Sequence, residues 1–157
     1  MENMIAHLQS HLLGLVHLLT ALAAMACGTA VIFAPKGTRR HRLLGRSYLL
    51  LMLAMNGTAL LIYELFGRFG PFHWMVLVSL ASVIGGYLAV WRKVPGWKYR
   101  HALFMVGSYV GLMAAAAAEV ASRVPGWQFG PSVAISSIVV IFVGIWMMQR
   151  KIPRIIG

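Results

Sequence analysis

The sequence predicts an all-α membrane protein with five transmembrane helices, four of them in an up-down bundle and the fifth packed outside it. Of the 157 residues, 60% are hydrophobic and only 11% are charged, whereas a soluble domain carries roughly a quarter charged residues. Five apolar stretches cover residues 11–34, 43–66, 72–91, 101–122 and 131–149. Each is close to the ~20 residues that a helix needs to cross hydrocarbon. We therefore expect residues 1–157 to form a single integral membrane domain.

The connections between these stretches are short and rich in turn-forming residues: "APKG", "GRFGP", "KVPGW" and "RVPGWQFGP". Short connections predict that successive helices are antiparallel neighbours. The first stretch is expected to remain in the protein, because "MENMIAHLQS" lacks the positive region of a removable signal peptide. Cys27 is the only cysteine. It is therefore expected to be a packing residue, since neither a disulfide nor a cysteine metal cluster is available.

The positive charges gather in alternate connections rather than along one face. Arg68 and Arg123 are the only cations in the second and fourth connections, whereas the others follow the first stretch (Lys36, Arg39, Arg40, Arg42, Arg46), the third (Arg92, Lys93, Lys98, Arg100) and the fifth (Arg150, Lys151, Arg154). The positive-inside rule then predicts that the N-terminus lies outside and the C-terminus lies in the cytoplasm. The net charge of +11 indicates anionic lipid head groups as partners and no nucleic acid.

Ionisable side chains within the membrane are the candidate functional groups, because they are costly to place there. The chain has no aspartate and three glutamates, one of which is the terminal Glu2. This scarcity largely excludes paired-carboxylate chemistry. The remaining candidates are six histidines, Glu64 and Glu119.

Four histidines sort into two layers at the expected membrane depths. His17 and His73 lie toward the outside, and His41 and His101 lie at the cytoplasmic end. In a cyclic up-down bundle each layer is one diagonal pair. A haem held between diagonal helices needs one imidazole from each side, so two haems b are predicted, with electron transfer across the membrane as the function.

Arginines and small residues fit the same hypothesis. Arg39, Arg40 and Arg100 would neutralise the propionates of the inner haem. The helical face through His17 also carries Ala21, Ala24 and Gly28. Such small residues leave room for a flat macrocycle, and they equally allow close helix packing. Mid-helix Asn56 is expected to make an interhelical hydrogen bond.

A metal site is the alternative. His17, His73 and Glu119 would supply the two imidazoles and one carboxylate of a zinc site, with Glu64 as general base, in a membrane hydrolase or metal carrier. Against it stands an ion pair between Glu119 and Arg123, four residues apart on one helix. A third possibility is a scaffold or assembly factor without any cofactor, in which His41 and His101 are ordinary interfacial polar residues.

Several motifs also resemble known families. The segments "PKGTRRHRLLGRSY", "GRFGPFH" and "YRHALFMVGSYVGL" resemble a family of bacterial predicted membrane proteins of unknown function (DUF2306), over roughly the first four apolar stretches. The motifs at His41 to Gly45 and at Arg100 to Tyr109 are similar to di-haem cytochromes b of the ascorbate-reducible, cytochrome b561-like type. That resemblance implies two haems held by four histidines of four consecutive helices. A quinone or other redox partner and a homo-oligomer are further expectations.

Overall fold

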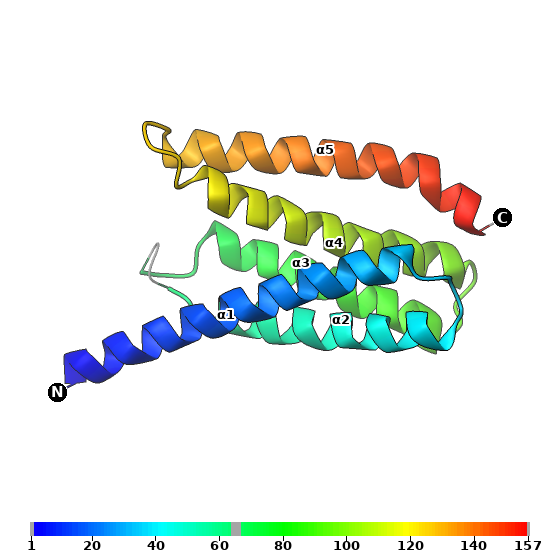
Figure 1. Ribbon diagram of the computed structural model, residues 1–157, viewed down its shortest axis with the longest axis horizontal. Coiled ribbons are helices and arrows are strands. Elements are labelled where there is room, and N and C mark those ends of the chain that lie inside the picture. Colours follow the sequence, from blue (N-terminus) through cyan, green and yellow to red (C-terminus); the bar gives the residue numbers. More distant parts are fainter. Residues whose placement is uncertain (1, 64–66, 157) are drawn as a thin grey trace. The chain divides into compact units, whose positions relative to one another are not determined.

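The chain folds into five α-helices, and the described residues contain no strand. The computed structural model describes residues 2–63 and 67–156, and the side chains of residues 11–63, 67–70 and 72–152. In chain order the helices are α1 (Glu2–Phe33), α2 (Arg39–Ala59), α3 (Pro71–Trp91), α4 (Trp97–Ala121) and α5 (Phe129–Ile156) (Figure 1). The predicted all-α class and number of helices are confirmed.

Four helices are long and apolar enough to cross a membrane. The apolar segments are His11–Phe33, Phe72–Trp91, Trp97–Ala121 and Phe129–Ile152. Within an apolar stretch of 18 residues in each segment, at most 22% of the residues are buried within the protein. Such a low buried fraction suits helices whose solvent is lipid. The helix that falls short is α2, because its first eight residues contain four arginines: Arg39, Arg40, Arg42 and Arg46. Four of the five predicted spans therefore correspond to helices that are long and apolar enough to cross a membrane.

Several helix boundaries differ from the predicted spans. Helix α1 begins at Glu2, nine residues before the expected span. Helix α2 begins at Arg39 because the hydroxyl oxygen of Thr38 caps its first turn, accepting from the backbone N–H of His41 at 3.2 Å. It ends at Ala59 instead of 66, since the backbone then turns through hydrogen bonds from Leu60 and the two residues that follow it. The end of the predicted span therefore lies outside α2.

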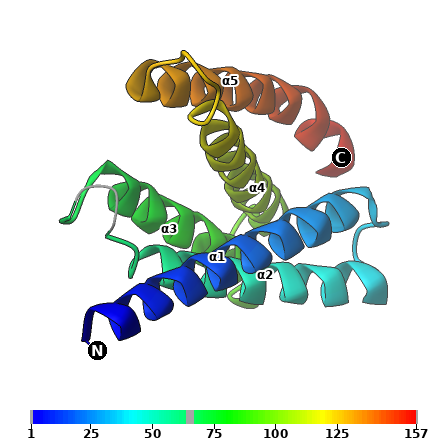
Figure 2. The ribbon, with the colours of Figure 1, turned by 60° about the vertical axis from the view of Figure 1, so that its left-hand side comes forward.

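The chain comprises two compact units, residues 1–81 and 82–157, whose boundary falls within α3. In the first unit α1 packs antiparallel along α2 (Figure 2). Ala24 is fully buried and Gly28 is buried as well, while Val31 lies opposite Gly45. Because this stripe of small residues includes the face of His17, it serves close packing of α1 on α2.

The buried face of α2 consists of Tyr48, Met52, Met55 and Asn56. The side-chain amide of Asn56 donates to the backbone oxygen of Met52 at 2.7 Å. The predicted interhelical hydrogen bond is therefore wrong: Asn56 is satisfied within its own helix, one turn back.

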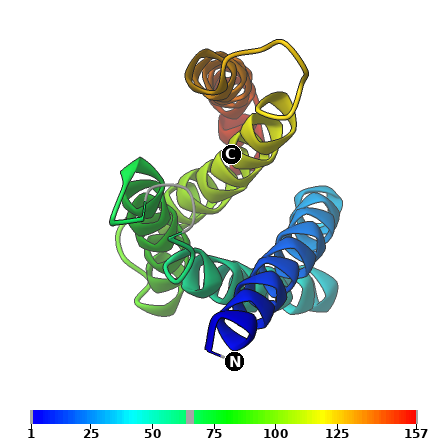
Figure 3. The same ribbon diagram turned by 90° about the vertical axis from the view of Figure 1, so that its left-hand side faces the viewer.

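In the second unit α4 contacts both the end of α3 and α5, and Figure 3 shows α4 and α5 side by side. Val110 packs so closely on Gly144 that no side chain would fit there without a shift. The side chain of Met105 likewise packs directly against Gly86, where an added Cβ atom would lie too close to it. Successive helices are thus antiparallel neighbours in the pairs α1–α2, α3–α4 and α4–α5. The four-helix bundle stays a prediction.

Candidate functional site

His17 is held in one tautomer by the opposite helix. Its Nδ1 lies 3.2 Å from the backbone oxygen of Met55 and 3.0 Å from the hydroxyl oxygen of Thr58. The Thr58 hydroxyl donates its own hydrogen to Met55 at 2.7 Å, so it accepts from His17. Since a carbonyl also only accepts, Nδ1 carries the proton and Nε2 carries the lone pair.

His101, near the start of α4, has the same tautomer. Its Nδ1 lies 3.0 Å from the backbone oxygen of Gly86 on α3. Because that oxygen can only accept, Nδ1 is the donor and the lone pair is again on Nε2. An Nδ1–H bonded to a carbonyl is the arrangement by which proteins orient histidines that bind metals through Nε2.

His73, in the first turn of α3, has the opposite arrangement. The backbone N–H of Gly70 donates to its Nδ1 at 3.1 Å, so the proton of the neutral ring is on Nε2. The ring is 4% exposed, and its Nε2 is buried without a hydrogen-bond partner in the described part of the chain. In this arrangement Nε2 is a donor and offers no lone pair to a metal.

The first unit separates its histidines along α2. His17 contacts the last turn of α2, and His73 contacts Tyr63 just beyond it, with ring centroids 4.6 Å apart. His41 lies at the other end of α2, half-buried in its first turn. The arrangement of the histidines in two layers stays a prediction. Because His101 belongs to the second unit, its pairing with His41 stays a prediction.

The predicted arginines are exposed. Arg39 and Arg40 form the start of α2, and Arg100 lies in the first turn of α4. All three guanidinium groups are available at helix ends, where propionates or lipid phosphates would meet them.

The carboxylates of the alternative metal site do not join the histidines. Glu119 forms an ion pair with Arg123 at 2.5 Å, and the two side chains are 65% and 67% exposed. This confirms the expected i,i+4 pair. Glu64 lies outside the described residues. Among the side chains of residues 11–63, 67–70 and 72–152, no three histidine, cysteine or acidic groups lie together in a way that could hold a metal ion.

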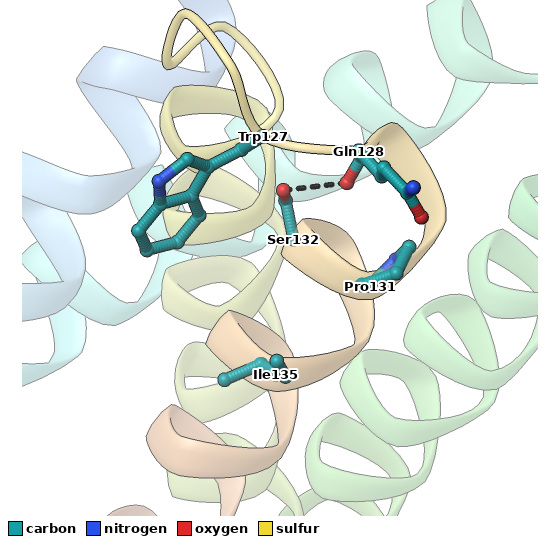
Figure 4. Close-up of a pocket in the computed structure, with 5 residues that line it drawn as sticks. All are labelled: Trp127, Gln128, Pro131, Ser132 and Ile135. Atoms are coloured by element: carbon teal, nitrogen blue, oxygen red, sulfur yellow. Dashed lines mark hydrogen bonds between the residues drawn. The ribbon is translucent and has the colours of Figure 1, made fainter.

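A shallow depression at the start of α5 is lined by Trp127, Gln128, Pro131, Ser132 and Ile135 (Figure 4). The Ser132 hydroxyl donates to the backbone oxygen of Gln128 at 2.6 Å. No predicted site residue lines this depression, and its one hydroxyl is already engaged, so it offers little chemistry.

Sequence reasoning missed the groups that orient the histidines. Thr58 could have been recognised from the sequence as a hydrogen-bond partner, because it is a hydroxyl residue in the last turn of an apolar helix. The carbonyls of Met55 and Gly86 carry no side-chain signal. They become recognisable only from the packing of neighbouring helices.

Five helices, four of them apolar enough to cross a bilayer, define a helical membrane protein. Residues 14–156 match the family described as "Predicted membrane protein (DUF2306)". The chain belongs to this family, as the resemblance predicted. No curated protein and no solved structure matches it. The similarity to di-haem cytochromes b stays a prediction.

Proposed function

We propose that this chain is a haem b-binding membrane protein that transfers electrons. His17 would be a ligand of the outer haem, and His101 would be a ligand of the inner haem. One observation carries the proposal: both imidazoles donate Nδ1–H to a backbone carbonyl of a neighbouring helix. That hydrogen bond selects the tautomer with a lone pair on Nε2 and orients the ring. These are the properties that an axial ligand requires.

Haem b, when bound, supplies one-electron redox chemistry, and the protein tunes its potential through ligands and surrounding charge. The exposed cations Arg39, Arg40 and Arg100 are suited to pair with carboxylates at the membrane interface. His41 would be a further ligand near Arg39 and Arg40. His73 is not used in this proposal, because its Nε2 carries a proton.

The membrane arrangement completes the proposal. Helix α2 has 21 residues, which corresponds to about 31 Å at ~1.5 Å per residue, so it matches the thickness of the hydrocarbon core. Its arginines would reach the lipid head groups, and the helix would be the fifth crossing. The charge distribution favours an outside N-terminus and a cytoplasmic C-terminus in a bacterial inner membrane.

An absorption experiment tests this function. The protein is expressed with added haem precursor, purified in detergent, and measured oxidised and dithionite-reduced, with haem and zinc quantified in the same sample. We expect a Soret band that weakens or shifts in His17→Ala and His101→Ala. His11→Ala is the matched control, because His11 is exposed on α1.

Three results would contradict the proposal. A protein that stays colourless and takes up no added hemin would not be a haem protein. Stoichiometric zinc, abolished by Glu119→Ala, would instead favour the metal site. A sample without either group would favour the scaffold or assembly factor.

A further inference from the structure

His73 contains a buried hydrogen-bond donor that lacks an acceptor. Its ring is 4% exposed. Its Nδ1 accepts from the backbone N–H of Gly70 at 3.1 Å, and its Nε2 has no partner among the described residues. Since Gly70 N–H can only donate, Nδ1 carries the lone pair and the neutral imidazole carries its hydrogen on Nε2. Most buried polar atoms are hydrogen-bonded, so this exception requires an explanation.

The aromatic neighbours do not supply the acceptor. The rings of Tyr63 and Phe69 lie 4.6 Å and 4.8 Å from the imidazole centroid, at interplanar angles of 32° and 31°. An N–H lies in the plane of its own ring. Because the planes of Tyr63 and Phe69 are tilted only slightly from the imidazole plane, the Nε2–H bond does not point into the π face of either ring. The two rings therefore pack against the imidazole and leave Nε2–H unsatisfied.

The site lies close to the protein surface at the start of a membrane-spanning segment. His73 is the third residue of α3, and the apolar segment of that helix begins at Phe72. Tyr63 and Phe69 are 43% and 47% exposed. A molecule in the surrounding bilayer thus meets two aromatic rings directly beside the buried donor.

We propose that Nε2–H of His73 donates to the carbonyl oxygen of a bilayer-soluble molecule, which displaces the groups that cover this atom in the structure. Beside an apolar helix end, carbonyl oxygens of lipid esters or of quinone head groups are candidate acceptors. The adjoining rings suit either ligand, because aromatic side chains pack on both acyl chains and planar head groups. A metal ion does not fit, since Nε2 carries a proton. The inference is independent of haem binding by His17 and His101.

The test compares the melting temperature of the protein in nanodiscs of two lipids. Ether-linked phosphatidylcholine lacks ester carbonyls, whereas the ester-linked lipid provides them, and short-chain ubiquinone is added to the ether-linked discs as the second arm. The variant His73→Asn keeps an oxygen that can accept from Gly70 N–H and removes the Nε2 donor. His11→Asn, at an exposed position of α1, is the matched control.

We expect an acceptor to raise the melting temperature of the wild-type protein and of His11→Asn by about 2–4 °C, as ligand linkage requires, and to leave His73→Asn unchanged. A gain in ester-linked lipid identifies a lipid carbonyl. A gain with ubiquinone in ether-linked lipid identifies a quinone. An equal response of wild type and His73→Asn in both arms would overturn the proposal.

A second measurement does not depend on the folding of the variant. In ¹⁵N-histidine-labelled wild-type protein, the Nε2–H proton of His73 should move downfield when the acceptor is present. An unprotonated Nε2 would overturn the inference. An Nε2–H chemical shift that stays the same with both acceptors would also overturn it. The Soret band of a haem-loaded sample should survive in His73→Asn. Its loss would show that His73 binds iron, which also contradicts the proposal.

Discussion

The Nδ1 atom of His101 lies 3.0 Å from the backbone oxygen of Gly86, and this hydrogen bond joins the start of α4 to α3. The same glycine is a point of close helix approach. A Cβ atom added there would lie 2.7 Å from the sulfur of Met105 and 3.3 Å from the Cβ of Phe104. The absence of a side chain at residue 86 therefore brings the carbonyl within reach of the imidazole.

We expect Gly86→Ala to separate α3 from α4 and to weaken the His101 hydrogen bond. Met105 is flexible and can move, but the Cβ of Phe104 belongs to the helix and cannot move alone. Overpacking of this kind costs about 1–3 kcal/mol. Thermal unfolding in detergent measures it, with haem retention as the second readout. Gly111→Ala is the control because its added methyl group meets nothing within 4 Å, and equal stability of the two variants would contradict the prediction.

Gly144→Ala should destabilise the contact between α4 and α5. The added methyl group would overlap the side chain of Val110, which is β-branched and has little rotamer freedom. We expect a loss of about 1–3 kcal/mol and its partial recovery when Val110→Ala is combined with it, because the two sites are coupled. Unfolding of the two single variants and the double variant gives the coupling energy, and simple additivity would argue against this packing.

Thr58→Val tests the hydrogen bond that orients His17. The substitution keeps the shape of the side chain and removes the acceptor that lies 3.0 Å from Nδ1. We expect a loss of about 1 kcal/mol in stability and, if His17 binds iron, about 10–100-fold weaker haem binding. Hemin titration followed at the Soret band measures the second effect. Thr29→Val on exposed α1 surface should bind hemin as the wild type does.

Lys36 closes the C-terminal end of α1. Its ammonium donates to the backbone oxygens of Val31, Ile32 and Ala34 at 3.2, 2.6 and 3.2 Å, carbonyls that the helix end would otherwise leave unpaired. Burial lowers the pKa of Lys36, so desolvation offsets part of this gain. We predict that Lys36→Met loses about 0.5–1 kcal/mol in thermal unfolding. The control Lys98→Met, at an exposed position, should lose less stability. A larger loss in Lys98→Met than in Lys36→Met would contradict the prediction.

Glu119→Gln should change little. The carboxylate is 65% exposed and is paired with Arg123 on the same helix, and such pairs contribute only about 0.3–0.5 kcal/mol, less at high salt. We therefore expect a small fall in melting temperature that disappears in concentrated salt, together with unchanged metal content. A large loss of bound zinc in this variant would support the alternative metal site.

The sequence alone determined the class of protein and most of its helices. Runs of about 20 apolar residues separated by Gly-Pro turns have few alternatives in a bilayer, because every backbone polar group there must be paired. The 3.6-residue period also predicted the packed face of α1 through His17 and Ala24.

Only the tertiary structure decided what the histidines can do. His17 and His73 were predicted to form one pair of iron ligands, yet one ring donates from Nδ1 to a carbonyl and the other accepts from Gly70 N–H. Asn56 likewise bonds within α2 and not across to another helix. The physical reason is that hydrogen-bond partners here are backbone atoms of neighbouring turns and helices. Their positions depend on packing within a few tenths of an ångström, which residue identity and spacing do not specify.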